Sequence, residues 1–443
     1  MPERSATLPG AHDLEVERVV PGGAGLARVN GRVALVEGAL PGDRVRAQLS
    51  SRSARLILGH VLEVSAPGAH RRPQAEVCPH ASDGSCGGCD WPAARLASHR
   101  ELKTSLVLDA FRRVGGLGQD DLPEPGWIGS PRSYRLRNRL HLGRDGRLGF
   151  YAPRSKEISD FVQCEIVSEP FLSRLPSIRA HLLSLGPAEG ELSTLEDREG
   201  RVVLGELRLG PGQGGGADSA ATKGPFDGFR LVAPDGRLLA EDGPGAVDLV
   251  AGGASFRVSV SSFFQGNRFL LDAFLDEIRT ALGAARPFRT ALDLYAGVGF
   301  LTRPLLEVVA AAGGQVVAVE VDESSSKDLS ENLGRWRSEG LNGARAEKVS
   351  AEAFLHSGLR PEDSGPYDVV VADPPRAGLS PSARRGLSRL RTESLLMVSC
   401  DPPTLARDVA ALHPDYAVRR LTLIDLFPGT HHVETVALLA RRT

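Results

Sequence analysis

The sequence predicts an α/β fold: a doubly wound parallel sheet in the C-terminal part, preceded by a small β-barrel and a mixed α+β central part. Three observations predict this arrangement. Strand-like and helix-like segments alternate over residues 256–443, which is typical of a parallel sheet covered by helices. Short strands separated by Gly-rich turns fill residues 1–66. Residues 67–255 mix both kinds of segment and hold four of the five cysteines.

With 443 residues, of which 41% are hydrophobic and 24% charged, the chain has the composition of a folded protein of two or three domains. It has no apolar run long enough to cross a membrane, and residues 1–5 lack the pattern of a signal peptide. We therefore expect a cytoplasmic protein without a membrane partner. The formal net charge of -2 excludes a polycation but leaves room for a local basic groove.

The N-terminal barrel is predicted from its turns. Asn30-Gly31 lies between two short β-type runs, at 26–29 and 33–36, and this dipeptide is a strong hairpin signal. Barrels of this kind often bind oligonucleotides. A module that only adds stability is an equally good interpretation of the pattern.

The central part contains a long amphipathic helix candidate at 93–114 and a segment rich in Gly, Ala and Ser at 211–225, which is predicted to be a surface loop. It also contains a basic stretch at 131–147. Arginines at alternating positions of a strand would line one face and suit phosphate contacts, although a solvated face is the alternative. The stretch comprises Arg132, Tyr134, Arg135, Arg137, Arg139, His141, Arg144 and Arg147.

Four cysteines form a candidate metal-binding set with the spacing C-x7-C-x2-C and a fourth member 75 residues further on. A structural zinc site usually shows two close pairs, whereas here only one close pair exists, so an iron–sulfur cluster is the better interpretation. Four unrelated thiols are disfavoured by the Gly87-Gly88 pair between two of them. The set is Cys78, Cys86, Cys89 and Cys164.

The C-terminal part begins with a predicted helix at 264–282, followed by predicted strands at 290–295, 316–321, 369–372, 395–399 and 433–439. The first strand runs into a G-x-G turn at Gly297, where backbone and helix N-terminus favour a close anionic ligand. Glu320 lies 23 residues after Gly297, a spacing that suits hydrogen bonds to ribose hydroxyls. NAD and S-adenosylmethionine both fit this pattern, and a Gly-rich turn without a ligand is the less favoured interpretation.

Further candidate residues end or begin the later strands. Asp373 and Arg376 belong to an Asp-Pro-Pro-Arg segment at the end of an apolar strand, where open α/β sheets bind ligands. Cys400 ends the next strand, before an Asp-Pro turn; it is either an inert core thiol or a nucleophile. Glu434 opens the last strand, either as a solvated edge residue or as a general base. The adjacent histidines are expected to shape the loop and not to bind a metal.

Four ordered segments carry a family resemblance: DLYAGVGF at 293–300, ADPPRAGL at 372–379, VSCDPPTLARD at 398–408 and FPGTHHVETVALL at 427–439. Together they resemble the RNA uracil-5 methyltransferases, which use S-adenosylmethionine. The resemblance runs over nearly the whole chain. It implies an OB-like TRAM barrel at 1–66, a central RNA-binding and cluster domain at 67–255, and a Rossmann-like class I methyltransferase domain at 256–443.

The resemblance also implies roles for individual residues. Cys400 would be the nucleophile and Glu434 the base, and the four-cysteine set would hold a [4Fe–4S] cluster. Many members of the family have Asn at the position of Phe300, and a commoner Ala at that of Pro403. The residues expected to contact the cofactor are Gln265, Tyr295, Gly297, Phe300, Glu320 and Asp373.

The expected reaction explains the residue types. Addition of a thiolate to C6 of uracil makes an enolate whose C5 attacks the methyl sulfonium, and a base then removes the C5 proton so that the thiolate leaves. We expect a monomer that acts on structured RNA, with 23S rRNA preferred over tRNA. The rivals are a non-catalytic RNA-binding iron–sulfur protein, opposed by intact Cys400 and Glu434, and a nicotinamide oxidoreductase, opposed by the missing third glycine and by Cys400.

Overall fold

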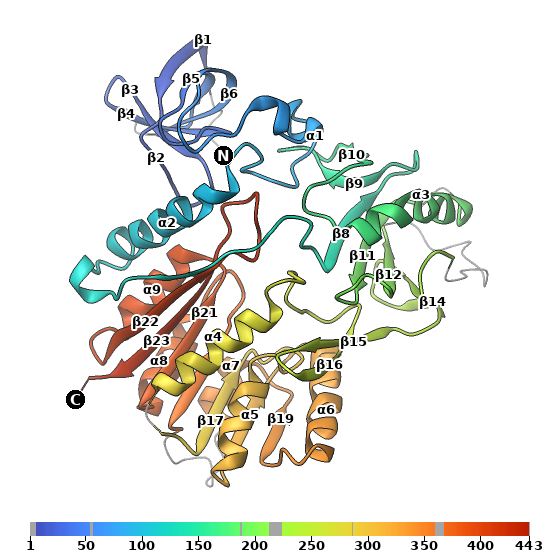
Figure 1. Ribbon diagram of the computed structural model, residues 1–443, viewed down its shortest axis with the longest axis vertical. Coiled ribbons are helices and arrows are strands. Elements are labelled where there is room, and N and C mark those ends of the chain that lie inside the picture. The colour runs from blue at the N-terminus through green and yellow to red at the C-terminus, as the bar shows by residue number, and fades with distance from the viewer. Residues whose placement is uncertain are drawn as a thin grey trace.

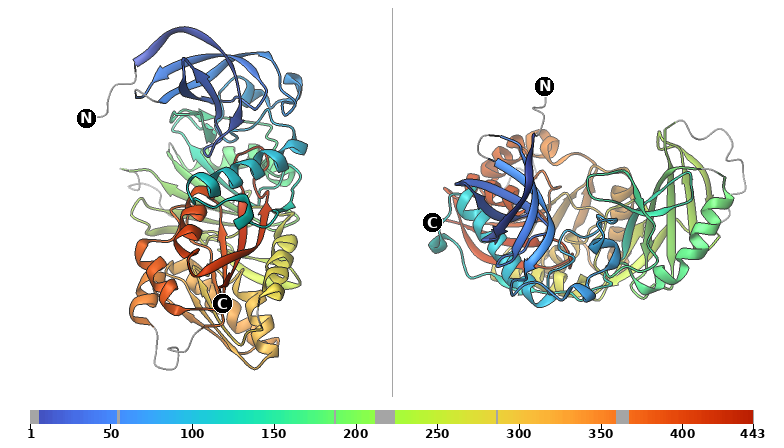
Figure 2. Two further views of the ribbon diagram at one scale, coloured as in Figure 1. Left: turned by 90° about the vertical axis from the view of Figure 1, so that its left-hand side faces the viewer. Right: turned by 90° about the horizontal axis from the view of Figure 1, so that it is seen from above.

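The computed structural model describes residues 6–53, 56–186, 188–211, 224–285, 287–358 and 367–442. Most of the predicted loop 211–225 lies outside these residues. In the described parts, no helix is both long and apolar enough to span a bilayer. The N-terminal strands and the central sheet lie on opposite sides of the molecule, next to the larger C-terminal sheet (Figures 1 and 2).

The N-terminal segment is a six-stranded sheet of order β1-β5-β6-β4-β3-β2 that curves around its own apolar core. The predicted hairpin at Asn30-Gly31 is confirmed, and both residues have positive φ, at 50° and 79°, as a two-residue hairpin turn of this type requires. Its assignment as a TRAM module stays a prediction. The strands are β1 (Ala6–Glu15), β2 (Arg18–Val19), β3 (Gly25–Val29), β4 (Arg32–Glu37), β5 (Arg44–Ser51) and β6 (Leu56–Ala66).

The segment after this sheet crosses to the C-terminal part of the molecule. Helix α2 (His99–Arg113) packs against α9 (Pro402–Leu412), and β7 (Gly126–Ile128) pairs in parallel with β22 (Tyr416–Ile424). The helix predicted at 93–114 begins only at His99. Before it, the Arg95 amide donates to the His70 carbonyl, which keeps this part of the chain out of the helix. Short helical turns flank it: η1 (Gln74–Glu76), α1 (Pro79–Ser82), η2 (Leu96–Ser98) and η3 (Gln119–Asp121).

The central sheet has seven strands in the order β10-β9-β8-β11-β12-β13-β14, with α3 packed on it. A separate hairpin, β15–β16, packs against α6 of the C-terminal part. The elements are β8 (Arg137–Leu142), β9 (Leu148–Tyr151), β10 (Ile158–Ser159), α3 (Glu169–Ser184), β11 (Gly190–Glu196), β12 (Val203–Leu209), β13 (Gly228–Val232), β14 (Leu238–Asp242), β15 (Ala246–Ala251) and β16 (Ala254–Ser259). The division at 67 and 256 stays a prediction.

The C-terminal sheet has the order β19-β18-β17-β20-β21-β23-β22-β7. Alternate residues of its strands enter two separate cores, one under α4, α5 and α6 and the other under α2, α8 and α9, so the sheet is doubly wound as predicted (Figure 1). The elements not yet given are α4 (Leu271–Ala284), β17 (Thr290–Leu294), α5 (Thr302–Ala311), β18 (Gln315–Val319), α6 (Glu323–Ser338), β19 (Ala344–Glu347), α7 (Ala351–Ala353), η4 (Phe354–Gly358), β20 (Val369–Ala372), α8 (Pro381–Leu390), β21 (Ser394–Ser399) and β23 (Glu434–Arg441).

Two expectations about this sheet need correction. It is not parallel throughout, because β23 runs antiparallel to both β21 and β22. The helix predicted from 264 begins only at Leu271. The reason is Asn267, whose Oδ1 accepts hydrogen bonds from the amides of Phe269 and Leu270, while the Gly266 carbonyl accepts one from the amide of Leu136. These bonds keep 265–270 outside the helix.

Candidate active site and cysteine pocket

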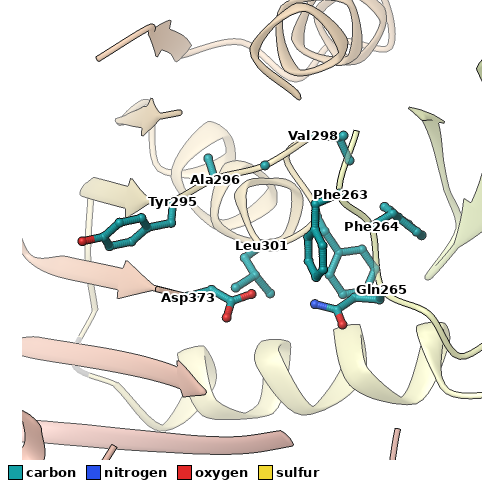
Figure 3. Close-up of a pocket in the computed structure, with 10 residues that line it drawn as sticks. Phe263, Phe264, Gln265, Tyr295, Ala296, Val298, Leu301 and Asp373 are labelled. Atoms are coloured by element: carbon teal, nitrogen blue, oxygen red, sulfur yellow. The ribbon is translucent and has the colours of Figure 1, made fainter. Parts of the chain in front are cut away.

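A pocket with an empty volume of about 320 Å³ opens at the carboxyl end of β17 (Figure 3). The turn after this strand has positive φ at Tyr295, Gly297 and Gly299, which curls the backbone around the pocket. Five of the six residues predicted to contact a cofactor line it. The lining residues are Phe263, Phe264, Gln265, Tyr295, Ala296, Gly297, Val298, Phe300, Leu301 and Asp373.

The sixth predicted residue, Glu320, is bonded to this turn. It follows β18, and its Oε2 accepts a hydrogen bond of 2.8 Å from the Gly297 amide, while Oε1 accepts one of 2.7 Å from the amide of Asp322. A carboxylate oxygen has further lone pairs, so Glu320 keeps capacity to accept from hydroxyl groups of a ligand. The six predicted residues therefore meet at one place.

The side chains of the pocket differ in direction and character. In Figure 3 the Asp373 carboxyl and the Gln265 amide point toward one another, whereas the Tyr295 ring extends away; its hydroxyl lies 3.5 Å from Glu352 Oε1. Phe300 is 6% exposed and packs against Phe264 with ring centroids 5.3 Å apart. Phe300 is thus an apolar wall of the pocket.

Buried carboxyl groups give the pocket its electrostatic character. Burial raises the pKa of Asp373 to about 7 and that of Asp293 to about 7. The Thr302 hydroxyl donates to Asp293 Oδ2 at 2.5 Å, while Oδ1 has no hydrogen-bond partner among the described residues. A positively charged ligand nearby would favour the ionised carboxylates, so the pocket suits a cationic group better than an anionic one.

Cys400 and Glu434 are neighbours although 34 positions separate them in the sequence. In the antiparallel pairing of β21 with β23, Ser399 lies opposite Thr435. The same register, continued by one position, places Cys400 beside Glu434. Because β20 is the other neighbour of β21, Asp373 ends at the same edge of the sheet.

Burial dominates the ionisation of this pair. It raises the pKa of the Cys400 thiol to about 12, with the Glu434 charge adding to the effect and Arg376 opposing it. Burial also raises the pKa of Glu434 well above its ordinary value, Asp373 adds to this, and Arg376 again opposes. Glu434 is 4% exposed, and its Oε1 has no hydrogen-bond partner among the described residues. A buried acceptor of this kind is available to a substrate.

Arg376, beside the pair, and Phe263, at the first pocket, were not among the predicted contacts. Arg376 Nη2 lies 3.4 Å from His432 Nε2, and burial lowers the pKa of His432 to about 4, so this imidazole is neutral at pH 7. Phe263 lines the first pocket with 65% of its surface exposed. The sequence signals were present: Arg376 follows the Asp-Pro-Pro segment, and Phe263 lies two residues before Gln265.

The four-cysteine set lines a second pocket, with an empty volume of about 390 Å³, to which Arg132, Phe150, Ile166 and Gly429 also contribute. The Gly88 amide donates to Cys86 Sγ at 3.4 Å, and burial raises the pKa of Cys89 to about 12. Among the described residues, no group of three or more His, Cys, Asp or Glu side chains is arranged to hold a single metal ion. Four thiols around one pocket fit a polynuclear cluster better than one ion.

The basic stretch differs from its prediction. Arg137, Arg139 and His141 do alternate with buried residues on β8. However, Arg137 Nη2 donates to the Val260 carbonyl at 2.8 Å, and burial lowers its pKa to about 10. Arg135 lies over the Phe150 ring, 5.0 Å from its centroid. Acidic partners are present for Arg132 (Glu165), Arg139 (Glu191), Arg144 (Glu189) and Arg147 (Asp145). The stretch is therefore not one open basic face.

Comparisons with known proteins agree with this geometry. The family model described as tRNA (uracil-5-)-methyltransferase matches residues 253–442. A 23S rRNA (uracil(1939)-C(5))-methyltransferase of Halomonas elongata is 32% identical over 99% of this chain and 91% of the relative. An uncharacterized RNA methyltransferase of Streptomyces coelicolor is 30% identical over 97% of this chain and 92% of the relative.

A solved structure shares the fold. The tRNA (uracil-54, C5)-methyltransferase of Pyrococcus abyssi, in complex with S-adenosyl-L-homocysteine, is 20% identical with a TM-score of 0.68, covering 96% of this chain and 100% of that chain. The fold is that of an S-adenosylmethionine-dependent methyltransferase with mixed α/β sheets. Because a relative is 32% identical over almost the full length, the chain belongs to the RNA (uracil-5-)-methyltransferase family and is an S-adenosylmethionine-dependent enzyme of that class.

Proposed function

We propose that this enzyme methylates C5 of a specific uridine in 23S rRNA, through a covalent bond between Cys400 and uracil C6. The observation that carries the proposal is the Cys400–Glu434 pair, which follows from the register of β21 with β23 and lies at the same end of the sheet as Asp373, a lining residue of the first pocket. A thiol and a buried carboxyl with an unpartnered oxygen are the two groups that the reaction needs.

The residues act in a defined order. The Cys400 thiol first gives its proton to water, and the thiolate Sγ then bonds to C6 of the uracil while the C5=C6 electrons move toward O4. S-adenosylmethionine supplies the methyl group that C5 takes. Glu434 then accepts the C5 proton, the C–H electrons re-form C5=C6, and the C6–S bond breaks with its electrons returning to Sγ. Arg376 is the cation that favours the thiolate form of Cys400.

The cofactor is held by the lining of the first pocket. Glu320 accepts hydrogen bonds from the ribose hydroxyls, and Gly297 permits close approach of the ligand. Gln265 and Asp373 provide polar contacts, while Tyr295 and Phe300 form walls. The exposed ring of Phe263 at this pocket provides a face on which an unstacked base packs.

The choice of 23S rRNA rests on the Halomonas relative, whose similarity extends over both chains. tRNA is the second candidate, favoured by the description of the family model and by the Pyrococcus enzyme. Mass mapping of 5-methyluridine in rRNA and tRNA from a deletion strain distinguishes the two. Loss of one site in 23S rRNA supports the proposal, and loss only in tRNA overturns the substrate assignment.

The cysteine pocket holds a [4Fe–4S] cluster ligated by the four cysteines named above. Four thiols converge on one pocket, and its apolar wall includes Phe150 and Ile166. When bound, such a cluster supplies electron-transfer capacity or rigidity, and no step of methyl transfer requires it. Anaerobic purification followed by iron and sulfide analysis tests the assignment; one equivalent of zinc without iron would overturn it.

We also propose the domain organisation and the oligomeric state. The separate core of the N-terminal sheet supports a TRAM module at 1–66, with 67–255 as the RNA-binding and cluster domain and 256–443 as the catalytic domain. The protein acts as a monomer. Light scattering of the purified protein measures its oligomeric state, and a stable dimer would contradict the assignment.

A further inference from the structure

The loop 425–433 joins β22 to β23, and its Gly429 lines the cysteine pocket. At its middle, the Gly429 carbonyl accepts a hydrogen bond of 2.9 Å from the Trp91 amide, and a Cβ placed on Gly429 would lie 3.6 Å from Cys89 Sγ. The next residue but one, His431, donates its amide to Asp90 Oδ1 at 2.9 Å. The loop ends directly before Glu434, the first residue of β23. The position of Glu434 therefore depends on this loop as well as on its pairing with Ile424 of β22.

Lys103 of α2 reaches the base of the loop. Its ammonium group is 0% exposed and donates to Asp425 Oδ1 at 2.5 Å, to the Phe427 carbonyl at 3.2 Å and to the His432 carbonyl at 2.6 Å. An ammonium has three hydrogens, and here each has an acceptor. Asp425 is 1% exposed, and its Oδ2 lies 2.8 Å from His99 Nδ1, so the pair is buried and hydrogen-bonded on both sides.

These contacts tie the two ends of the loop together. Asp425 follows the last residue of β22, and His432 lies two residues before Glu434. The Glu434 Oε1 atom has no hydrogen-bond partner of its own among the described residues, so the direction of this carboxyl depends on where the backbone places it. No contact of Lys103 with the cofactor pocket or with Cys400 is present in the described residues.

We propose that Lys103 is a positioning residue for proton removal: by joining Asp425 to the His432 carbonyl it holds Glu434 within reach of the C5 proton. This inference rests on the proposed role of Glu434 as the base. The affected step moves one proton from C5 to the carboxylate, re-forms C5=C6 and releases the Cys400 thiolate. Thiolate addition and methyl transfer do not require Glu434 as an acceptor, so they continue when the loop is displaced.

Lys103→Met in the full-length, cluster-loaded enzyme tests the inference. The substrate is unmodified 23S rRNA with methyl-labelled cofactor, and denaturing gels separate free RNA from RNA attached to protein. We expect methyl transfer at a near-normal rate, release of product slower by tenfold to about a hundredfold, and a labelled covalent adduct that accumulates. The affinity for S-adenosylmethionine should stay within about twofold of the unmodified enzyme, since the cofactor pocket is untouched.

Three further variants separate positioning from stability. Val107→Ala removes a buried contact on the same helix toward the second core and leaves the loop alone, so it should lower the melting temperature without accumulating adduct. Lys103→Met/Asp425→Leu removes both charges; it should recover melting temperature relative to Lys103→Met but still release product slowly. Asp425→Asn keeps the shape and weakens one contact, and it should show a smaller defect in the same direction if Lys103→Met fails to fold.

The outcomes are distinct. A trapped adduct in the Lys103 and Asp425 variants, but not in Val107→Ala, supports the inference. Normal product release by the double variant overturns it. Glu434→Gln serves as the reference: if it traps adduct while the Lys103 variants release product normally, only the positioning role fails. If Glu434→Gln traps none, the base assignment fails and the inference with it.

Discussion

At the scale of single residues, burial favours the protonated forms of the acidic groups in the candidate active site. Cys400, Glu434 and Asp373 lie at one edge of the sheet, and each has a raised pKa. Arg376 opposes the shift at the first two. Burial therefore keeps Cys400 as a thiol at pH 7 and disfavours the carboxylate form of Glu434. Substrate entry must change this balance, because catalysis needs a thiolate first and a carboxylate later.

Glu434→Gln provides the clearest test of the base. Glutamine keeps the size of the side chain but accepts no proton at this pH. We expect RNA attached through Cys400 with the methyl group already on C5, seen as a labelled band on denaturing gels and absent from Cys400→Ala/Glu434→Gln. Normal release of 5-methyluridine would return Glu434 to a structural role, and loss of both product and adduct would indicate substrate positioning.

Asp293 provides a prediction about stability and pH. Its folded-state pKa, about 7, lies above the ordinary value of 3.8, so the folded state binds a proton that the unfolded chain has already lost. The stability of the folded state should therefore decrease as pH rises through this window. Asp293→Asn removes that contribution. We expect the free energy of unfolding, measured with urea, to decrease between pH 5 and pH 8. This decrease should be smaller in the variant than in the unmodified enzyme by at least about 1 kcal/mol. Equal losses would contradict the raised pKa.

At the scale of elements, the segment before α4 places Gln265 because it is not helical. Asn267 is 0% exposed; its Oδ1 accepts from the amides of Phe269 and Leu270, directly before α4, while its Nδ2 donates to Ser130 Oγ at 2.8 Å and to the Leu426 carbonyl at 2.9 Å. One side chain thus joins the start of α4, the end of β7 and the end of β22. The cofactor pocket depends on this junction, since Gln265 is two residues away.

Asn267→Ala should therefore affect two properties together. Loss of four hydrogen bonds, with partners left buried, should lower the free energy of unfolding by about 1–3 kcal/mol or more. The affinity for S-adenosylmethionine should fall because Gln265 loses its support. Denaturant unfolding and calorimetric titration measure the two effects. Phe269→Ala, which removes a side chain 45% exposed on the same segment, is the control and should alter neither strongly.

At the scale of the whole molecule, the central part is not a separate lobe beside the catalytic sheet. Helix α2 packs against α9 of the C-terminal part (Figure 1), β7 pairs with β22, and Gly429 of the loop 425–433 lines the cysteine pocket. RNA that contacts the central sheet would therefore be held by a surface that is in contact with the C-terminal part of the molecule. The arginines of β8 are where this arrangement is most easily tested.

Arg139→Ala and Arg137→Ala should have different effects. Arg139 is 73% exposed in its side chain, so its loss should weaken RNA binding and reduce the slope of log affinity against log salt by about one unit. Arg137 donates to the Val260 carbonyl inside the protein, so its loss should lower stability instead. Binding titrations at several salt concentrations and thermal unfolding check both. An unchanged slope for Arg139→Ala would make it a solvated residue.

The sequence by itself determined the chemistry-bearing positions and the strands that carry them. The apolar runs at 369–372 and 395–399 predicted β20 and β21 almost to the residue, because strands buried on both faces leave an unbroken apolar signal. The G-x-G turn and Glu320 predicted the cofactor loop, and their contact at 2.8 Å follows from neighbouring parallel strands. The four ordered segments at 293–300, 372–379, 398–408 and 427–439 together predicted the family.

Other features depend on contacts between residues that are distant in the sequence, and only the tertiary structure decided these. Asn267, before α4, is held by bonds to Ser130 and Leu426, β23 runs antiparallel to both of its neighbours, and Arg137 donates to the Val260 carbonyl. The meeting of Cys400 with Glu434 depends on an antiparallel register, and the burial of Lys103 depends on packing between residue 103 and residues 425–432. Local patterns carry the propensity of a segment, whereas contacts over hundreds of residues fix its direction, register and charge state.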